Sequence, residues 1–380
     1  MGFFRKKQSY LGIDIGTSAI KLTELESERS RPKLVTYGFL EQETDLLHGD
    51  IEEQKQKILP ALKKIYKASQ AQSDKVVAAL PSYAVFSSII QLPVMSKKDL
   101  ASAIRWEANK FVPIPLKEMV LDWKILDEEM VSTENTPVET FEDSGGAVDP
   151  TLQPHSLPTI VGKPTKNIKI LITAAPKNLV NKYVEIFRTG GLQLVSLETE
   201  SFALERSLIG HDKSAIMVID IGASATNINV MMNSIPIISR SIDLGGNTIT
   251  KTISNSLNID HVRAEQFKRD IGLNTSKSGT AGTQIPSRIE FLINSIVNEI
   301  RYVMNMYQGQ HDKDIEKVIL AGGSSWLPNL TSFLSQTLNL RVFIGDPWAR
   351  IVYPVELKPA LNEIGPSYAV SVGLAMREIV

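Results

Sequence analysis

The feature that most constrains the fold of this chain is a short segment that occurs twice. Residues 11–20 read Leu-Gly-Ile-Asp-Ile-Gly-Thr-Ser-Ala-Ile, and residues 217–226 read Met-Val-Ile-Asp-Ile-Gly-Ala-Ser-Ala-Thr. In each copy an apolar strand ends in Asp-Ile-Gly, turns, and continues as a second strand. Two halves built on one plan predict two like domains, and the cleft between such domains is the default ligand site.

Each copy has the groups that phosphate binding needs. Gly16 lets a phosphate approach backbone N–H groups closely, Thr17 and Ser18 offer hydroxyl groups, and the carboxylate of Asp14 suits a hydrated Mg²⁺. The second copy offers the same set less one hydroxyl: Asp220, Gly222, Ala223 and Ser224. A tight structural hairpin explains either copy alone equally well. The two together favour a pair of hairpins that bind a polyphosphate from both sides.

A third segment extends the set. Residues 318–328 predict a buried strand, then a double glycine, then the Ser-rich start of a helix. This helix is expected over 327–337. Gly322 and Gly323, with Ser324 after them, would admit a base or ribose close to the backbone, and Trp326 could cover its apolar face. Alone, such a turn is usually only a turn. The last helix is expected over 366–378.

Composition excludes several classes of protein. The 41 basic and 42 acidic residues leave no surplus of positive charge for a nucleic acid. The absence of cysteine excludes disulfides, Cys-ligated zinc, iron–sulfur clusters and thiol catalysis. No segment approaches the ~18 apolar residues that span a bilayer, and no apolar region of a signal peptide follows the first lysines. These features predict a soluble, cytoplasmic chain.

The ordered motifs Asp-x-Gly-Thr-Ser, Asp-x-Gly-x-Ser and Gly-Gly-Ser-Ser resemble the nucleotide signature of the actin, Hsp70 and sugar-kinase superfamily. Residues 200–203 resemble the first connecting helix of this superfamily, whose Glu faces the γ-phosphate. Residues 369–376 resemble the second connecting helix, where a small residue permits close helix contact. Glu265 and Lys268 resemble the pair that holds the adenosine. Their spacing places both on one helix face, although an exposed salt-bridged face is the alternative explanation.

Within that superfamily the sequence is similar to the type IV pilus assembly protein PilM family over essentially its whole length. The segments that carry this resemblance are 2–7, 91–100, 103–108, 112–115, 121–123, 243–250, 345–350 and 372–378. The clearest departure is the segment 128–166. Residues 127–150 hold eight acidic residues and no Lys or Arg, which predicts a flexible surface loop.

The resemblance implies an α/β fold with two actin-like (ribonuclease H-like) ATPase domains around a nucleotide cleft, and a small inserted FtsA-like α/β subdomain. Domain one would comprise 9–81, 167–210 and 362–380, the partner-binding insertion 82–166, and domain two 211–361, with its outer part at about 250–312.

The implied ligand is Mg·ATP. Asp14 and Asp220 would hold the hydrated metal. Glu200 would orient the attacking water and complete the catalytic set, and Glu198 is a weaker candidate for orienting that water. The residues expected to contact the nucleotide are Asp14, Gly16, Thr17, Ser18, Lys21, Asp220, Gly222, Ala223, Ser224, Gly246, Glu265, Lys268, Gly322, Gly323, Ser324 and Trp326. Slow ATP turnover at most is expected from the family.

The family also implies a role in pilus assembly, twitching motility and secretion. The chain would be a scaffold at the inner face of the plasma membrane that binds the N-terminal cytoplasmic tail of PilN and connects it to other inner-membrane pilus components and the motor. Its membrane association would be peripheral, through these partners. We expect the tail in a groove between the insertion and domain one. Most of the apolar stripe Leu100, Ile104, Ala108 and Phe111 would pack on the insertion's own sheet.

Two alternatives stay open at this point. A polymer-forming cell-division protein of the FtsA type shares the inserted subdomain, but it normally continues into a linker and an amphipathic membrane helix, whereas this sequence stops at Val380. A small-molecule kinase needs an acid/base carboxylate for its second substrate, and none is identified outside the nucleotide motifs. The iron–sulfur activator ATPases of the superfamily are excluded because the chain has no cysteine.

Overall fold

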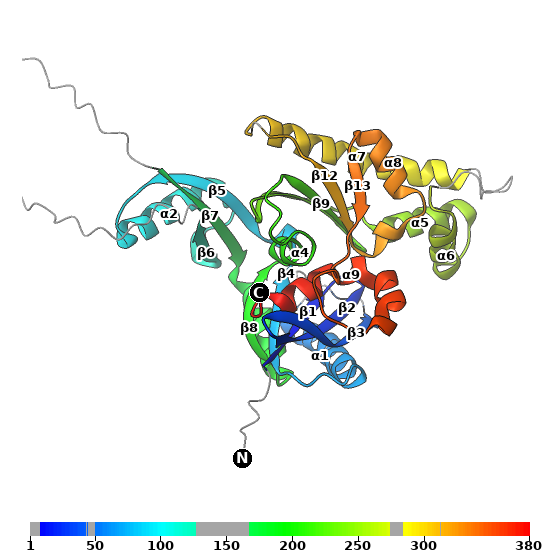
Figure 1. Cartoon of the computed structure of the whole chain (residues 1–380), viewed down its shortest axis with the longest axis horizontal. Coiled ribbons are helices and arrows are strands. Elements are labelled where there is room, and N and C mark those ends of the chain that lie inside the picture. The colour runs from blue at the N-terminus through cyan, green and yellow to red at the C-terminus, as the bar shows by residue number, and fades with distance from the viewer. Residues whose placement is uncertain (1–7, 43, 45–49, 127–166, 274–283, 312) are drawn as a thin grey trace, which may run out of the picture. The chain divides into compact units, whose positions relative to one another are not determined.

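The computed structural model describes residues 8–42, 44, 50–126, 167–273, 284–311 and 313–380 (Figure 1). They form two compact units. Unit 1 comprises Met1–Phe86, Glu118–Val120 and Ala174–Val380, and unit 2 comprises Ser87–Lys117 and Leu121–Thr173. The predicted acidic loop 128–166 lies outside the described residues. Within the described part of the chain, no helix is both long and apolar enough to cross a membrane.

The first sheet of unit 1 has the strand order β3-β2-β1-β4-β8. It consists of β1 (Ser9–Ile15), β2 (Ala19–Glu28), β3 (Arg31–Glu41), β4 (Lys75–Leu80) and β8 (Gln193–Thr199). The first three strands pair antiparallel as a meander, and β4 and β8 continue in parallel with β1. Helices α1 (Ile51–Ala68) and α3 (Lys177–Thr189) bury their apolar faces against this sheet.

The second sheet repeats this plan. Its order is β11-β10-β9-β12-β13, with strands β9 (Ile216–Ile221), β10 (Thr226–Met232), β11 (Ile235–Ile242), β12 (Lys317–Ala321) and β13 (Arg341–Ile344). Again three strands form an antiparallel meander and two follow in parallel. The repeated sequence therefore begins each sheet at the same position, and the predicted duplication is confirmed.

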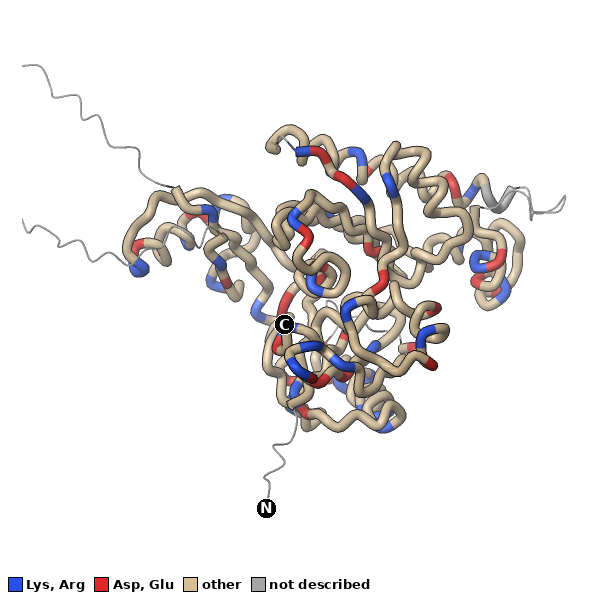
Figure 2. Tube along the Cα trace, viewed as in Figure 1, with Lys and Arg blue, Asp and Glu red and all other residues tan. Residues whose placement is uncertain are grey.

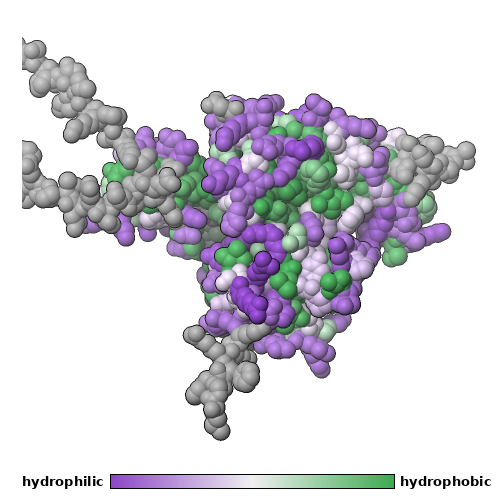
Figure 3. Space-filling model, viewed as in Figure 1, coloured by the Kyte–Doolittle hydropathy of each residue, from purple (hydrophilic) through white to green (hydrophobic). Residues whose placement is uncertain are grey.

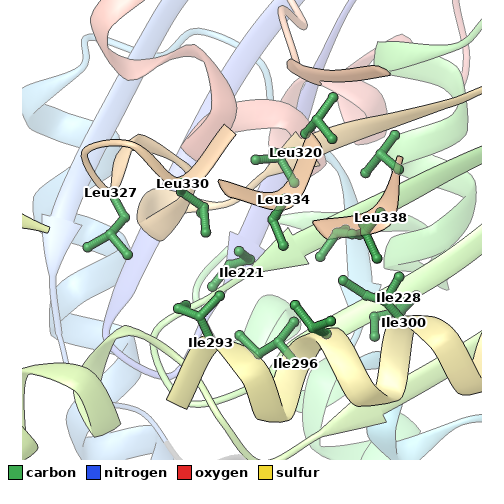
Figure 4. Packing of buried hydrophobic residues seen from close by; sticks show 14 of the residues in the cluster. Ile221, Ile228, Ile293, Ile296, Ile300, Leu320, Leu327, Leu330, Leu334 and Leu338 are labelled. Carbon is green, nitrogen blue, oxygen red and sulfur yellow. The ribbon is translucent and has the colours of Figure 1, made fainter. Parts of the chain in front are cut away.

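Helices on one face of the second sheet enclose a large core. They are α5 (Gly246–Leu257), α6 (His261–Ile271), α7 (Gln284–Gln308) and α8 (Leu330–Leu338). Apolar residues at helical spacing along α7 face those of α8 and the strands (Figure 4). The labelled side chains are Ile293, Ile296 and Ile300 from α7, Leu330, Leu334 and Leu338 from α8, and Ile221, Ile228, Leu320 and Leu327.

Two helices share a buried cluster with both sheets. Side chains of α4 (Glu200–Leu208) and α9 (Lys358–Met376) pack with β4 of the first sheet and with β9 and β12 of the second. The two helices meet at Gly373, where an added Cβ would lie 2.5 Å from the carbonyl carbon of Ala203 and closer to its oxygen. The predicted close helix contact is confirmed.

The described residues of unit 2 form a three-stranded sheet of order β5-β7-β6 and one α-helix. Its elements are β5 (Phe86–Pro93), α2 (Lys97–Phe111), β6 (Met119–Ile125) and β7 (Asn167–Pro176), the last of which runs on into unit 1. Ser96 caps α2 by accepting from the N–H of Asp99. Leu100, Ile104 and Ala108 are buried, as the apolar stripe predicts. The predicted domain boundaries, including the insertion at 82–166, stay a prediction.

Three elements differ from the sequence-based expectation. Strand β8 was not predicted, because polar Gln193 and Ser196 interrupt its pattern at the edge of the sheet. Helix α9 starts at Lys358 and contains Pro366, although a proline usually marks the first turn of a helix. The helix expected over 327–337 is present as α8, but it begins three residues later, at Leu330, and a separate 3₁₀ turn, η5 (Gly323–Trp326), precedes it.

Charged and apolar side chains are both distributed along the described surface. Figure 2 shows Lys and Arg interspersed with Asp and Glu along the trace, and Figure 3 shows hydrophobic residues mixed with hydrophilic ones on the viewed face. Exposed large apolar side chains such as Phe291 and Phe343 come from different elements, α7 and β13. Such scattered exposure is normal for a folded protein.

Candidate functional site

The two repeated turns meet in unit 1. Each closes with the same bond, from the glycine N–H to a backbone oxygen three residues on: Gly16 to Ala19 at 3.0 Å and Gly222 to Ala225 at 2.9 Å. The hydroxyl oxygens of Thr17 and Ser224 lie 2.9 Å apart. Asn247, at the start of α5, adds a bond of 3.1 Å to the hydroxyl of Ser18. The structure thus brings the two predicted hairpins together.

Two aspartates and one lysine flank these turns. Asp14 is opposite Lys21 in the strand ladder, and their side chains form an ion pair of 3.0 Å. Burial lowers the pKa of Lys21, but Asp14 more than offsets this, so the pKa is raised. Asp220 is opposite the neutral Asn227. Burial raises the pKa of Asp220 to about 6. The positive charge of Lys21 acts to lower this pKa, and the negative charge of Asp14 acts to raise it.

Glu200 is the third acid of this cluster, at the first position of α4. Its Oε2 accepts from Ser82 twice, from the N–H at 3.0 Å and the hydroxyl at 2.8 Å, and from Nδ2 of Asn227 at 3.0 Å. Burial, followed by the charges of Asp220 and Asp14, raises the pKa of Glu200 to about 8. Sequence reasoning missed Ser82 and Asn227 as partners. Their only signals are that Ser82 follows a buried strand and Pro81, and that Asn227 interrupts an apolar one.

The raised pKa of Glu200 predicts a pH-dependent stability. Between pH 4.5, the ordinary pKa of a glutamate, and about pH 8, Glu200 keeps its proton in the folded protein and loses it in the unfolded chain. This group therefore makes stability fall as pH rises through that window. The Glu200→Gln variant lacks the charge and keeps the acceptor. It should raise the free energy of unfolding by roughly 2 kcal/mol at pH 8, after allowance for solvent screening, and by less at pH 5.

Urea unfolding at the two pH values measures this difference. Glu356→Gln, on an exposed glutamate of the 3₁₀ turn η6 (Val355–Leu357), is the matched control and should change stability equally little at both. An equal effect of Glu200→Gln at pH 5 and pH 8 would contradict the assignment of a raised pKa.

Glu198, the weaker candidate for orienting water, has a different role. Its carboxylate receives both terminal nitrogens of Arg206, at 2.8 and 2.9 Å, and one of Arg377 at 2.6 Å. It is 7% exposed. A buried carboxylate engaged by two arginines is a structural link between β8, α4 and the end of α9, so the expectation that Glu198 orients water is wrong.

A second group of predicted residues surrounds Gly246. The N–H of Gly246 donates to the oxygen of Gly222 at 2.9 Å, which connects this group to the second hairpin. Lys268 is paired with Glu265 at 2.6 Å and reaches the carbonyl of Gly246 at 3.3 Å. An added Cβ at Gly246 would collide with Ser324, so these segments are in close contact.

Burial distinguishes this pair from a solvated helix face. Lys268 is only 8% exposed, so the alternative of an exposed salt bridge is wrong for the lysine. Burial lowers its pKa against the charge of Glu265. The pKa of Glu265 is lowered to about 2, because hydrogen bonds from Lys268 and Thr250 outweigh the burial that would raise it.

The double glycine has two environments. Gly322 has a φ of 83°, and an added Cβ would lie 2.5 Å from Oδ1 of Asp220, so the protein itself requires this glycine. An added Cβ at Gly323 would meet nothing within 4 Å, which leaves its face open to a ligand. Trp326 is 49% exposed at the end of η5, while Leu327 turns into the core.

The donor set suits phosphate with a hydrated cation better than a directly held metal. Among the described residues, no group of three or more His, Cys, Asp or Glu side chains is placed to hold a metal ion. Asp14, Asp220 and Glu200 nevertheless place three carboxyl groups around Lys21. Mg²⁺ commonly binds in this way, through one or two carboxylates, several waters and the phosphates of a nucleotide.

Two sheets of equal strand order that share two helices, each contributing a glycine turn to one site, define the actin-like fold. EutJ from Carboxydothermus hydrogenoformans has it (TM-score 0.54, 16% identity, 97% of this chain and 89% of EutJ covered). MreB5 of Spiroplasma citri bound to AMPPNP has it as well (TM-score 0.51, 12% identity, 98% and 96% covered).

The sequence model of the type IV pilus assembly protein PilM family matches residues 12–139 and 154–379, and the chain belongs to this family. It is thus an actin-like protein of type IV pilus assembly. It is similar to the solved PilM-PilN type IV pilus biogenesis complex, with a TM-score of 0.77, 27% identity and 98% of both chains covered. The cell division protein FtsA of Bacillus subtilis is 24% identical over 233 residues, 54% of this chain and about half (48%) of FtsA.

Proposed function

We propose that this chain is an ATP-binding scaffold of the pilus machinery that binds the N-terminal tail of PilN. The observation that carries this proposal is the similarity, at a TM-score of 0.77 over 98% of both chains, to a structure of a PilM-PilN complex. The similarity to FtsA covers 54% of this chain, which supports an FtsA-like polymer less well.

Nucleotide binding is supported by the clustering of the predicted residues. Asp14 and Asp220 would hold hydrated Mg²⁺. Burial is the main reason that the pKa values of Asp220 and Glu200 are raised, and the divalent cation would relieve the repulsion between carboxylates that adds to it. The residues proposed around the phosphates are Gly16, Thr17, Ser18, Lys21, Gly222, Ala223 and Ser224. Those proposed around the nucleoside are Gly246, Glu265, Lys268, Gly322, Gly323, Ser324 and Trp326. That the similarly folded MreB5 was solved with AMPPNP supports this class of ligand.

ATP would serve mainly as a structural ligand, with slow turnover. Glu200 is the residue proposed to orient water. Its Oε2 already accepts three hydrogen bonds, and at neutral pH its pKa of about 8 keeps it largely protonated until a cation binds nearby. A group in this state is a poor base, which fits a site that binds nucleotide more readily than it hydrolyses it.

The partner site is proposed in the insertion. Among the described strands of the unit 2 sheet, β5 and β6 are the outer ones, and an extended peptide can add to such an edge by main-chain hydrogen bonds. The stripe of α2 that faces inward is occupied by the unit's own core, as the burial of Leu100, Ile104 and Ala108 shows. Binding to PilN would place the chain at the inner face of the plasma membrane, with the other pilus components and the motor as further partners.

Hydrogen exchange tests both parts of this proposal on the intact chain. Mg·ATP should protect the amides of the two hairpins, around residues 14–21 and 220–227. A synthetic peptide of the cognate PilN tail, added next, should protect residues 75–93 and 119–125. Protection by the tail confined to 211–361 would place the peptide in the wrong half of the chain. A lack of any protection by Mg·ATP would exclude the nucleotide assignment.

A further inference from the structure

We propose that Ser82 is a positioning residue that holds Glu200 and transmits the occupancy of the phosphate site to the strand that enters unit 2. This inference rests on the proposed nucleotide binding, and it concerns how that binding is felt elsewhere in the chain.

The contact that carries the inference is the convergence of three donors on one oxygen. Oε2 of Glu200 accepts from the N–H of Ser82 at 3.0 Å, from its hydroxyl at 2.8 Å and from Nδ2 of Asn227 at 3.0 Å. A carboxylate oxygen offers two lone-pair sites, so three donors fully occupy it. Glu200 thereby ties the first residue of α4 both to the 3₁₀ turn η1 (Ser82–Ala84) and to β10.

Ser82 lies where the chain leaves the first sheet. β4 ends at Leu80, η1 follows Pro81, and β5 begins at Phe86, the last residue before the chain enters unit 2. The turn itself is held by backbone bonds from Ala84 to Pro81 and from Val85 to Ser82. A shift at Ser82 is therefore passed by covalent continuity and two hydrogen bonds to the first residues of β5.

The same carboxylate faces the phosphate site. Asn227 donates to Glu200 and is the ladder partner of Asp220, so Glu200 lies beside one of the two residues proposed for the hydrated cation. The charges of both aspartates act on Glu200. Because three donors already occupy Oε2 of Glu200, this oxygen can accept from a water next to a terminal phosphate only if it gives up one of them. Two arrangements follow, one with Glu200 bonded to Ser82 and one with Glu200 turned to the ligand's water. A ligand with a third phosphate favours the second because it binds that arrangement better.

Hydrogen exchange of residues 82–93 distinguishes the two arrangements. In the wild-type chain, amides there should exchange about tenfold faster with Mg·AMPPNP than with Mg·ADP, because the triphosphate analogue releases Ser82. In Ser82→Ala the exchange should already be fast with Mg·ADP, and the difference between the nucleotides should fall below about twofold. Ser82→Thr keeps the hydroxyl and should restore the difference.

The matched control is Ser87→Ala, the same change on an exposed position of β5, which should keep the wild-type difference. Equal exchange with both nucleotides in the wild type, when calorimetry shows both to be bound, would overturn the inference and leave the proposed function intact. A full difference in Ser82→Ala would overturn it as well. Failure of both nucleotides to bind would remove the proposed function and this inference together.

A second readout separates coupling from a merely structural role of Ser82. The affinity of the synthetic PilN tail should differ by about fivefold or more between the Mg·AMPPNP and Mg·ADP forms of the wild type, as typical allosteric couplings do. In Ser82→Ala the affinities for the tail in the two nucleotide forms should differ by less than about twofold, whatever the change in stability. A variant that only loosened the fold would lower both affinities and keep their ratio.

Discussion

The Gly373→Ala substitution is expected to destabilise the protein by about 3 kcal/mol or more. An added Cβ would lie 2.5 Å from the carbonyl carbon of Ala203 and 2.9 Å from its Cα, closer than real Cβ atoms approach a backbone. Alanine favours a helix interior over glycine by roughly 1 kcal/mol, which is too little to offset the collision. The obstacle is backbone on a second buried helix, so no side chain can rotate away.

Urea unfolding measures this effect, and Gly309→Ala is the matched control. An added Cβ there would meet the oxygen of Asn305 at 3.4 Å, an ordinary contact, so its effect should stay within about 0.5 kcal/mol. Because α4 and α9 share a core with both sheets, loosening their contact should lower the stability of unit 1 as a whole. Equal stability of the Gly373→Ala and Gly309→Ala variants would show that the two helices are not in contact as described.

The sequence was sufficient to predict the two sheets and the meeting of their hairpins. The reason is local: an apolar strand, a glycine turn and an alternating strand specify a hairpin without reference to the rest of the chain. β8 was missed because its place depends on pairing with β4, far away in the sequence, and not on a strong pattern of its own. The start of α9 was missed because Pro366 lies inside the helix, whereas a proline usually marks the first turn.

The candidate site could be predicted in its members but not in its electrostatics. Glu198 and Glu200 are two residues apart and both acidic, yet Glu198 is neutralised by two arginines and Glu200 faces two aspartates. Which environment each receives depends on where α4, α9 and β10 meet, and no local pattern encodes that. Ser82 and Asn227 were missed for the same reason, since each becomes a partner of Glu200 only through the three-dimensional contact.

The Asp14→Ala substitution is expected to reduce the Mg²⁺-dependent affinity for ATP by about 100-fold or more, with the fold retained. Asp14 is one of two carboxylates proposed for the hydrated cation, and it is the residue that holds Lys21, at 3.0 Å. Its loss removes a ligand of the cation's waters and frees the lysine, which can then turn to Asp220. Calorimetry with and without Mg²⁺ measures the first effect, and circular dichroism checks the fold.

The same variant has a second consequence that does not need the nucleotide. The charge of Asp14 contributes to the raised pKa values of Asp220 and Glu200, about 6 and about 8, so both should fall when it is removed. Carboxylate titration by infrared or NMR spectroscopy would detect this. Asp314→Ala, on an exposed aspartate before β12, is the control and should change neither affinity nor these pKa values. If the affinity of Asp14→Ala for ATP depended on Mg²⁺ as in the wild type, the cation would be held elsewhere. Unchanged pKa values of Asp220 and Glu200 would mean that the three acids do not form one electrostatic cluster.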